Sequence, residues 1–505
     1  MNAIELKNVC FTYQGVKDTG LKGVNLDVKQ GEFLLLTGRS GCGKTTLTRL
    51  INGLIPHFFP GELSGTVLVN GKDVQKASTY ELAEMVGSVF QDPRSQFFTT
   101  NTISEVAFGC ENLNLPSAQI NQRVSDAFTA FQIEDLKNRS IFSLSSGEKQ
   151  KIALASTYAM RPGIYVLDEP SANLDIHATK MLGKLLKTLK EQGATIIVSE
   201  HRLYYLMELA DRVIYMRDGE LLQEWMPEQT LKLPERELVE KGLRAFDLDM
   251  LTLPEHQLPP PSAPMPAFAV KNISINLSGH ALLRGINFSV APQDGQGIIG
   301  ITGANGVGKT TLVKCLCGLL KRQHGSVEVD GHVLSSRQRA REMYFVMQDT
   351  DYQLFTESVE DELRLGNQKV PELEAKITDA LAMLGLSEYR KIHPMALSGG
   401  QKQRVTIASA AVNPARILFF DEPTSGLDGE NMRSVSKILE ALNQNGKLIF
   451  IISHDLEFLL NTCRRIIHLQ NGTVTEDFLL TEKTVDKLKS LLFAEPENNR
   501  QSSTK

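Results

Sequence analysis

The chain has 505 residues, and its 54 Lys and Arg residues against 59 Asp and Glu residues give a formal charge of −5. At about 150 residues per domain, this length predicts two to four domains. The negative charge argues against a protein whose main task is to bind nucleic acid backbones, since such proteins are usually basic. With 42% hydrophobic and 22% charged residues, the composition is typical of a globular protein and argues against a disordered or fibrous chain.

Cysteine use and hydropathy indicate a chain without disulfides or membrane spans. Six cysteines are too few for a disulfide scaffold and form no CxxC motif, so reduced thiols in a cytoplasm are expected. No segment reaches the roughly 18 consecutive apolar residues that a spanning helix needs. The start, Met1–Glu5, lacks the basic and apolar stretches of a signal peptide. Any membrane role is therefore expected to come through a partner.

Short apolar runs followed by loops and helical patterns predict an α/β fold. Runs of this kind occur at Glu32–Thr37, Gly163–Leu167 and Thr195–Ser199. Strands buried on both faces read as continuous apolar runs, which favours a mostly parallel sheet covered by helices. Helices are expected at Thr45–Leu54 and Thr310–Leu320, each directly after a glycine-rich loop.

Residues 226–266 differ in composition from their surroundings, because they hold 8 of the 20 prolines. Such a stretch favours extended chain and is interpreted as a linker, with a short helix over Glu235–Phe246 before its proline-rich part. The polar tail after Ala494 is expected to fray.

The chain is an internal duplication, because four landmarks recur in the same order. The matched pairs are Lys44 and Lys309, Gln91 and Gln348, Asp168 and Asp421, and His201 and His454. The separation falls from 265 residues for the first pair to 253 for the last two, so the first copy carries about a dozen extra residues. Ile55–Gly61 is part of that insertion. Two copies of one domain explain this pattern.

Each copy carries a GxxxxGK[ST] phosphate loop, GRSGCGKTT at 38–46 and GANGVGKTT at 303–311. The glycines allow backbone N–H groups to turn inward, and the following helix adds its positive end. The Lys is expected to reach the outer phosphates and the first Thr to hold Mg²⁺. A simple glycine turn is the alternative, which two matches in register make improbable. The candidate ATP-binding residues are Gly38, Ser40, Gly41, Gly43, Lys44, Thr45 and Thr46, and in the second copy Gly303, Asn305, Gly306, Gly308, Lys309, Thr310 and Thr311.

A second nucleotide motif ends a predicted strand in each copy. Asp168 and Asp421 are expected to deliver a carboxylate to the Mg²⁺ shell, and the following Glu169 and Glu422 to polarise an attacking water. The alternative is a solvated acidic turn after a core strand. The phosphate loops in the same copies favour the catalytic interpretation.

The segments LSSGEKQ at 144–150 and LSGGQKQR at 397–404 precede the Asp-Glu pairs by the same interval, and each Ser could simply cap a helix. The order of phosphate loop, Gln, Leu-Ser-Gly-Gly-Gln, Asp-Glu-Pro and His resembles the ATP-binding cassette (ABC) ATPases over nearly all of 1–225 and 267–475. The resemblance implies two P-loop domains in tandem, at 1–225 and 267–475, each with a mostly parallel sheet core, an antiparallel N-terminal subdomain and a helical subdomain. The linker at 226–266 joins them, and 476–505 form a C-terminal helix and polar tail.

The resemblance also implies how ATP is hydrolysed with Mg²⁺. The Leu-Ser-Gly-Gly-Gln segment, called the signature below, closes in one domain over the ATP bound by the other. Ser398, Gly399, Gly400 and Gln401 would therefore contact the ATP bound at Lys44, and Ser145 and Gly147 the ATP bound at Lys309. Gln91 and Gln348 would contact Mg²⁺ or the water. His201 and His454 would hold the γ-phosphate and the water, their alternative being a capping histidine at a strand end. Pairing of the two domains within one chain is the preferred arrangement.

Two departures from the family pattern predict unequal sites. In the first signature Ser146 replaces Gly and Glu148 replaces Gln. Tyr13 matches the aromatic residue that stacks on adenine, whereas Leu277 stands nearest in the second copy. Both departures fall on the site built from Lys309 and the first signature, so the site at Lys44 is expected to be the faster one.

The segments QDPRSQFF at 91–98, QDTDYQLF at 348–355 and NGLIPH at 52–57 resemble the ATPases of energy-coupling factor (ECF) transporters. Such proteins lie at the cytoplasmic face of the membrane and power uptake of vitamins or metal ions; the fused form is most similar to the subset for thiamine precursors. The implied partners are an integral membrane transport subunit and a separate solute-binding membrane protein. Phe97, Phe98, Leu354 and Phe355 are candidates for contact with the membrane subunit or for its support.

Three alternatives remain. A fused sugar-importer ATPase has about this length, but its signatures and Gln loops fit less well. An ABC-type translation factor that binds ribosomes has a long charged helical linker and an Asn-His-Leu-Asp segment, whereas this linker is proline-rich and 171–175 and 424–428 lack that His. A DNA-repair ATPase would insert coiled coils or zinc modules, and no nucleic acid partner is expected.

Overall fold

The computed structural model describes residues 1–15, 20–172, 174–254, 263–277, 280–292, 297–320 and 324–494. The chain divides into two compact units, one with Met1–Leu248 and Asp428–Glu430, the other with Asp249–Leu427 and Asn431–Lys505. Within the described residues each unit contains a four-stranded and a six-stranded sheet. The domain boundaries given above stay a prediction. The expected extended stretch Pro259–Pro261, the frayed tail after Ala494 and the side chains of Ser146 and Leu277 lie outside the described residues.

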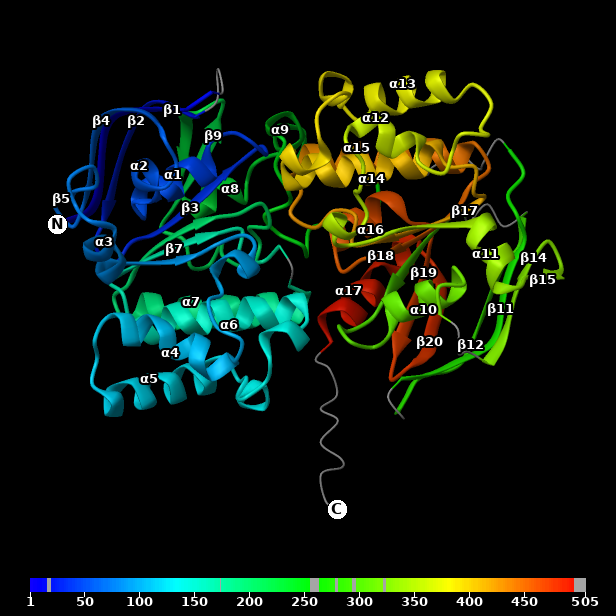
Figure 1. Cartoon of the computed structure of the whole chain (residues 1–505), viewed down its shortest axis with the longest axis horizontal. Coiled ribbons are helices and arrows are strands. Elements are labelled where there is room, and N and C mark those ends of the chain that lie inside the picture. Colours follow the sequence, from blue (N-terminus) through cyan, green and yellow to red (C-terminus); the bar gives the residue numbers. More distant parts are fainter. Residues whose placement is uncertain are drawn as a thin grey trace, which may run out of the picture. The chain divides into compact units, whose positions relative to one another are not determined.

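The first unit combines an antiparallel sheet with a mostly parallel one (Figure 1). The antiparallel sheet has the order β2 (Gly20–Lys29), β1 (Asn2–Tyr13), β4 (Gly61–Val69) and β5 (Lys72–Asp73). The second sheet has the order β10 (Glu220–Trp225), β9 (Arg212–Arg217), β3 (Phe33–Gly38), β8 (Thr195–Ser199), β7 (Ile164–Asp168) and β6 (Val86–Val89). Its strands are parallel except for β10, which pairs antiparallel with β9.

The helices of the first unit cover the parallel sheet and build a helical group. Figure 1 shows α4, α5 and α6 gathered away from the antiparallel sheet, which makes them the expected helical subdomain. The helices are α1 (Lys44–Ile51), α2 (Leu54–His57), α3 (Thr79–Met85), α4 (Thr102–Asn112), α5 (Ser117–Ala130), α6 (Ser146–Met160), α7 (Ile176–Glu191), α8 (Pro227–Thr230) and α9 (Glu235–Lys241), with 3-10 turns η1 (Pro93–Gln96), η2 (Glu134–Leu136) and η3 (Ile141–Ser143).

The second unit repeats this architecture. Its antiparallel sheet has the order β12 (His280–Val290), β11 (Phe268–Leu277), β14 (His324–Val329) and β15 (His332–Val333), and its larger sheet β16 (Met343–Val346), β17 (Ile417–Asp421), β18 (Leu448–Ile452), β13 (Ile298–Thr302), β19 (Arg465–Gln470) and β20 (Thr473–Leu479). Its helices are α10 (Lys309–Leu316), α11 (Ser336–Glu342), α12 (Val359–Arg364), α13 (Leu373–Met383), α14 (Gly399–Val412), α15 (Gly429–Gln444), α16 (Leu456–Thr462) and α17 (Val485–Phe493), with 3-10 turns η5 (Thr350–Tyr352), η6 (Ser387–Tyr389), η7 (Pro394–Ala396) and η8 (Glu482–Thr484). The predicted α/β fold class is confirmed in both units.

The parallel strands are buried over their whole length, as their continuous apolar sequences predict. Every residue of β3, β7 and β8 is buried, and so is every residue of β13, β17 and β18. In the first unit one core lies on each face of the larger sheet, since Phe33 and Leu35 belong to one cluster and Leu34 and Leu36 to another. The ends of these strands are therefore rigid platforms for the loops that follow them.

Three helices end earlier than the sequence pattern predicts, and each ends near a glycine with positive φ. Helix α1 ends before Gly53 (φ 75°), α10 before Gly318 (φ 76°) and α9 at Gly242 (φ 72°). The left-handed conformation is open to glycine and terminates a helix. After α9 the chain stays packed on the first unit, because Leu243 and Phe246 are buried in its core.

Candidate functional site

The two phosphate loops connect a central strand to a helix in each unit. Gly38 (φ 149°) and Gly303 (φ 141°) end β3 and β13 in a conformation that L side chains rarely adopt. A Cβ at Gly38 would lie 2.2 Å from the Met216 carbonyl oxygen, and one at Gly303 would lie 2.3 Å from that of Leu469. Glycine is therefore required at both positions by backbone shape and by space.

Each phosphate-loop lysine is buried and lies inside its own loop. The Lys44 ammonium donates to the carbonyl oxygens of Gly38 at 3.0 Å and Arg39 at 3.2 Å. Lys309 donates to the matching oxygens of Gly303 at 2.6 Å and Ala304 at 3.0 Å. Each loop thus holds the positive charge of its lysine at the start of a helix, α1 or α10, where backbone N–H groups can bind an anion.

The acidic residues that end β7 and β17 lie beside these loops. The Thr310 hydroxyl donates to the Asp421 carboxylate at 2.6 Å. Burial and the nearby charge of Glu169 raise the pKa of Asp168, although Thr45 and Lys44 act in the opposite direction. Burial also raises the pKa of Asp421. Both carboxylates would therefore be stabilised by an additional positive charge in the site.

Glu169 is the centre of a polar cluster in the first unit. It has a positive φ of 46°, and its backbone N–H donates to the Ser199 carbonyl at 2.8 Å. Its carboxylate accepts from the Gln91 amide at 2.6 Å and lies 3.2 Å from the His201 ring nitrogen. Burial opposes the charged form, but His201, Lys44 and Gln91 outweigh it and lower the pKa of Glu169. The carboxylate is thus ready to accept a proton at neutral pH.

The matching cluster in the second unit is looser. Glu422 also has a positive φ, 48°, but its carboxylate is 3.7 Å from the His454 ring nitrogen and 3.4 Å from the Ser453 hydroxyl. His454 instead lies 3.0 Å from the Lys309 ammonium and 3.1 Å from the Asn305 side-chain oxygen. Gln348 is exposed, and within the described residues its side chain makes no hydrogen bond. The two clusters therefore differ in how they hold the candidate base.

Glu200 was not predicted from the sequence, and its carboxylate fixes the backbone next to the Glu169 cluster of the first unit. This buried carboxylate accepts from the backbone N–H of Ser171 at 3.0 Å, from that of His201 at 2.8 Å and from the Tyr205 hydroxyl at 3.1 Å. Ser453 stands at the matching position of the second unit. The only sequence signal is a charged residue between an apolar strand and the candidate histidine, where burial is unexpected.

The signature serines cap helices, as the local pattern allows. Ser145 and Glu148 form a reciprocal capping box at the start of α6, and Ser398 and Gln401 form one at the start of α14. Within the described residues, the side-chain hydrogen bonds of both serines stay inside these boxes. A Cβ placed on Gly399 would have no atom within 4 Å other than those of its chain neighbours and its own helix backbone, so the space beside this glycine is open. The first unit therefore carries a negative charge at a helix start where the second carries a neutral amide.

Tyr13 lies beside the phosphate-loop helix of the first unit. Its hydroxyl is 3.2 Å from the Thr46 hydroxyl and accepts from Arg49 at 3.2 Å. Its ring makes edge contacts with Phe11 and with Phe59 of the inserted segment. The insertion thus contributes to the surroundings of the candidate adenine-stacking residue, which is only half-buried.

Gln96 and Gln353 follow Gln91 and Gln348 by five residues, and their side chains form hydrogen bonds that connect the loop to the edge strand of the sheet. Gln96 accepts from the Phe90 N–H at 3.3 Å and donates to the Ser88 carbonyl at 3.1 Å. Gln353 repeats this with the Met347 N–H at 3.0 Å and the Phe345 carbonyl at 3.4 Å. These glutamines therefore set the shape of the loop in both units.

The loops present one exposed aromatic residue each. Phe98 is 73% and Phe355 is 74% exposed, whereas Leu354 is buried and Phe97 packs against the core. The buried Glu105 accepts from the Phe98 N–H at 3.1 Å, and the buried Glu362 accepts from the Phe355 N–H at 3.0 Å. Both glutamates belong to the next helix, so each aromatic residue is fixed to the helical group.

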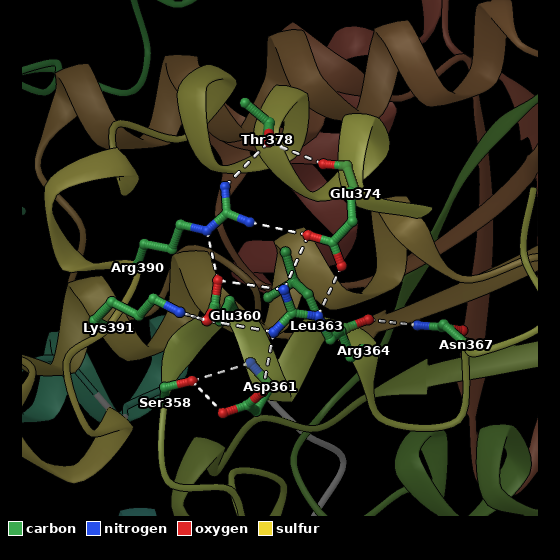
Figure 2. A network of polar contacts seen from close by, with 10 residues as sticks. All are labelled: Ser358, Glu360, Asp361, Leu363, Arg364, Asn367, Glu374, Thr378, Arg390 and Lys391. Carbon is green, nitrogen blue, oxygen red and sulfur yellow. Dashed lines mark hydrogen bonds and ion pairs between the residues drawn. The ribbon is translucent and has the colours of Figure 1, made fainter. Parts of the chain in front are cut away.

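In the second unit an ionic network anchors that next helix, α12 (Figure 2). The Glu360 carboxylate, whose side chain is 4% exposed, accepts from Arg390 at 2.6 Å and also contacts Arg364 and Lys391. Figure 2 shows Glu374 bridging Arg364 and Arg390 from α13. The network links the segment after the Gln loop to α13 and to the chain before the signature.

Glu360→Gln is expected to lower the melting temperature of the protein by a few degrees at pH 7, because three cations lose their shared anion. Hydrogen bonds from Arg390 and Lys391 lower the pKa of Glu360 to about 2. A depressed pKa stabilises the fold above the unfolded value near 4.3, and this stability is lost as the pH falls toward 2. Urea unfolding of both proteins between pH 7 and pH 3 checks this. A difference that grew toward pH 3 would contradict it.

The residues beside the phosphate loops fit a divalent cation. Asp168 Oδ1 is buried and has no hydrogen-bond partner among the described residues, which is the expected state of an oxygen that awaits a cation. Carboxylate and hydroxyl oxygens are ligands that Mg²⁺ accepts, and it usually completes its shell with waters and phosphate oxygens. No group of three or more His, Cys, Asp or Glu residues suited to a metal occurs in the part of the chain described.

Comparison with known proteins identifies the family of both units. The sequence model described as ABC transporter matches residues 21–172 and 283–425. A Treponema denticola protein named "Putative ABC transporter ATP-binding protein" is 45% identical over 94% of this chain and 96% of its own length. The structure of cbiO1 from Clostridium perfringens, part of the ABC transporter complex cbiONQ, is 31% identical over 48% of this chain and 94% of that chain, with a TM-score of 0.42. The archaeal ribosome recycling factor aABCE1, solved with the stalk protein aP1, is 19% identical over 95% of this chain and 92% of that chain, with a TM-score of 0.62, and shares the fold.

The helices in the described residues are all too short or too polar to cross a membrane. The assignment of catalytic, ATP-binding and metal-binding roles to individual residues stays a prediction. The geometry brings Lys44, Asp168, Glu169, Gln91 and His201 together in the first unit. It brings the corresponding residues of the second unit together except for Gln348.

Proposed function

Because the chain belongs to the ABC transporter family, as an ATP-binding ATPase with two tandem domains, we propose that it powers a transporter of the energy-coupling factor type. In this proposal the protein lies at the cytoplasmic face of the membrane and contacts an integral membrane transport subunit. A separate membrane protein selects the solute, which is a vitamin or a metal ion.

The proposed reaction is attack of a water on the γ-phosphate, which breaks the bond to the β–γ bridging oxygen so that ADP leaves, with Glu169 or Glu422 accepting the water proton as general base. The Glu169 carboxylate is supported in this role by its position between Gln91 and His201, and its lowered pKa keeps it in the charged form that can accept a proton. Lys44 offers its positive charge to the outer phosphates, where negative charge develops in the transition state. His201 keeps the carboxylate charged and can donate to the phosphate oxygen that faces it.

Mg²⁺ bound with the nucleotide would be held by Thr45 and Asp168, or by Thr310 and Asp421, and would offset charge on the phosphate oxygens. The raised pKa of both aspartates supports this assignment, since a buried carboxylate gains most from a cation. The side chains of Gln91 and Gln348 complete the proposed set of ligands for the cation or the water.

We further propose, from the resemblance to ABC ATPases, that each ATP is shared between the domains. Ser398, Gly399, Gly400 and Gln401 would serve the nucleotide at Lys44, and Ser145 and Gly147 the nucleotide at Lys309. Backbone N–H groups at a helix start, ordered by a capping box, are suited to bind a phosphate. ATP binding would then draw the domains together and hydrolysis would release them.

The observation that carries the transport proposal is the matched pair of exposed aromatic residues after the Gln loops. Phe98 stacks on Phe108 with ring centroids 5.0 Å apart and stays 73% exposed, and Phe355 is equally exposed in the other unit. A large exposed apolar side chain whose backbone is fixed by a buried glutamate is suited to receive a partner helix. In the first unit Gln91, in the same loop as Phe98, donates to Glu169 and so connects that loop to the candidate base.

Purification of the tagged full chain from its own cells, in mild detergent and with ATP, tests this function. We expect co-purification of an integral membrane subunit together with a small membrane protein that binds a vitamin or metal ion. Membrane permeases with a soluble sugar-binding protein would instead indicate a sugar importer. Ribosomal subunits without any membrane protein would indicate a translation factor and would overturn the transport proposal.

A further inference from the structure

The second unit contains a cavity of about 650 Å³ whose lining includes no residue of its phosphate loop. The cavity is bounded by α13, by the end of α14 and the turn after it, and by the end of α15 with the turn before β18. Its apolar wall includes Met383, Leu384, Ile438 and Leu442. This volume is within the range of about 300–1,000 Å³ that small-molecule sites usually have.

Two aromatic rings occupy the corresponding place in the first unit. At the fixed separation of 253 residues, Leu384 corresponds to Phe131 and Ala411 to Tyr158. The rings of Phe131 and Tyr158 pack edge to face with their centroids 6.0 Å apart. In the second unit the smaller Leu384 and Ala411 both line the cavity. The hollow therefore arises from two large-to-small differences between the copies.

The charges around this place are also rearranged between the copies. In the first unit Arg161 pairs with Asp126 at 2.7 Å, and Arg123 donates to the Met160 carbonyl at 2.9 Å. The matching residues of the second unit are Pro414 for Arg161, Asp379 for Asp126 and Lys376 for Arg123. The second unit therefore lacks both the Arg123 contact with the carbonyl and the Arg161–Asp126 ion pair.

A new lysine caps one of the corresponding carbonyls and a neighbouring one in the second unit. Lys447, where the first unit has Ala194, donates to the Asn413 carbonyl at 2.7 Å and to the Ala415 carbonyl at 2.6 Å. Lys376 is left with no side-chain hydrogen bond or ion pair among the described residues. Burial lowers the pKa of the half-buried Lys447 to about 8, and the charge of the exposed Lys376 acts in the same direction.

The balance of charge at the cavity is positive. Lys369, Lys376 and Lys447 line it against the single carboxylate of Asp379. An anionic group among these lysines would relieve their repulsion, while an apolar body could cover Leu384, Ile438 and Leu442. Met383, 57% exposed at this wall, adds a flexible apolar side chain that adapts to different shapes.

We propose that this cavity is a binding site for a small amphipathic carboxylate, with the carboxylate at Lys376 and Lys447 and an acyl chain against the apolar wall. The site is separate from the ATPase machinery and does not depend on the transport function proposed above. The corresponding place in the first unit holds two aromatic rings and an ion pair instead.

Isothermal titration of the full chain with decanoate, below its micelle concentration, tests the proposal. We expect saturable binding of one decanoate per chain. Lys376→Gln is expected to weaken binding about tenfold, the effect of losing one favourable charge contact of about 1.4 kcal/mol. Ala411→Tyr, which installs the residue of the first copy, is expected to abolish it. Lys187→Gln, an exposed lysine of the first unit, is the matched control and should bind like wild type.

Two further ligands separate the charge from the apolar contact. Acetate lacks the acyl chain and decyltrimethylammonium lacks the negative charge, so neither should show saturable binding. The proposal is overturned if wild type does not bind decanoate, or if Ala411→Tyr binds as tightly while its melting temperature is unchanged. Equal binding of decyltrimethylammonium would also overturn it. ATPase activity, measured in parallel, reports whether each variant is folded.

Discussion

Glu169→Gln should reduce the steady-state ATPase rate of the full chain on the order of 10²-fold or more, and Glu422→Gln should reduce it by a clearly smaller factor. The Glu169 carboxylate is gripped by Gln91 at 2.6 Å and His201 at 3.2 Å, and its pKa is lowered. Glu422 is 3.7 Å from His454. The site that contains Glu169 is also the one proposed to use the regular signature at Ser398.

Phosphate release at saturating ATP measures both rates, and binding of a fluorescent ATP analogue checks that each variant still binds nucleotide. The amide retains the shape of the carboxylate but cannot accept a proton, so affinity should stay close to wild type while turnover falls. Glu148→Gln is a separate test of the same inequality, since it places the neutral residue of the second signature in the first. Equal losses from Glu169→Gln and Glu422→Gln would contradict unequal sites.

The parts of the site that follow from sequence are those where backbone geometry demands one residue type. Gly38 and Gly303 are examples, because no side chain fits beside the Met216 and Leu469 carbonyls. The strands β3 and β13 could likewise be recognised from apolar runs alone, since burial on both faces leaves no alternation. Such local rules gave the fold class and the phosphate loops.

Other features depend on partners that a sequence does not mark. Glu105 and Glu362 hold backbone N–H groups of the preceding loop, and every residue type except proline offers such a donor. Glu200 likewise accepts from two backbone N–H groups. Carboxylates of this kind read as exposed charges until the chain that surrounds them is known.

The cavity of the second unit could not be predicted from the sequence, for a different reason. Its volume depends on Leu384 and Ala411, which are far apart in sequence and unremarkable as single residues. Only the duplication gives a reference, because Phe131 and Tyr158 are the aromatic residues at the corresponding positions of the first unit.

The predicted helix ends were wrong for a simpler reason. The apolar period continues past Gly53 and Gly318, where the backbone already adopts a left-handed conformation.

Phe98→Asp combined with Phe355→Asp should abolish co-purification of the membrane subunit while the ATPase of the isolated chain stays near wild type. A charge in an apolar helix-binding surface must be desolvated without a partner, which costs far more than the lost contact area. Both side chains are about three-quarters exposed, so the substitutions leave the core intact. Detergent extracts of cells expressing tagged wild type or variant, compared by mass spectrometry, measure the effect.

Val333→Asp provides the control, because Val333 is also a large exposed apolar residue, 63% exposed, but lies on β15 of the antiparallel sheet. It should leave the membrane subunit bound. The single variants are informative as well: if each domain receives one partner helix, each should weaken capture, and the double variant should remove it. Full capture by the double variant would show that the aromatic residues after the Gln loops do not contact the transport subunit.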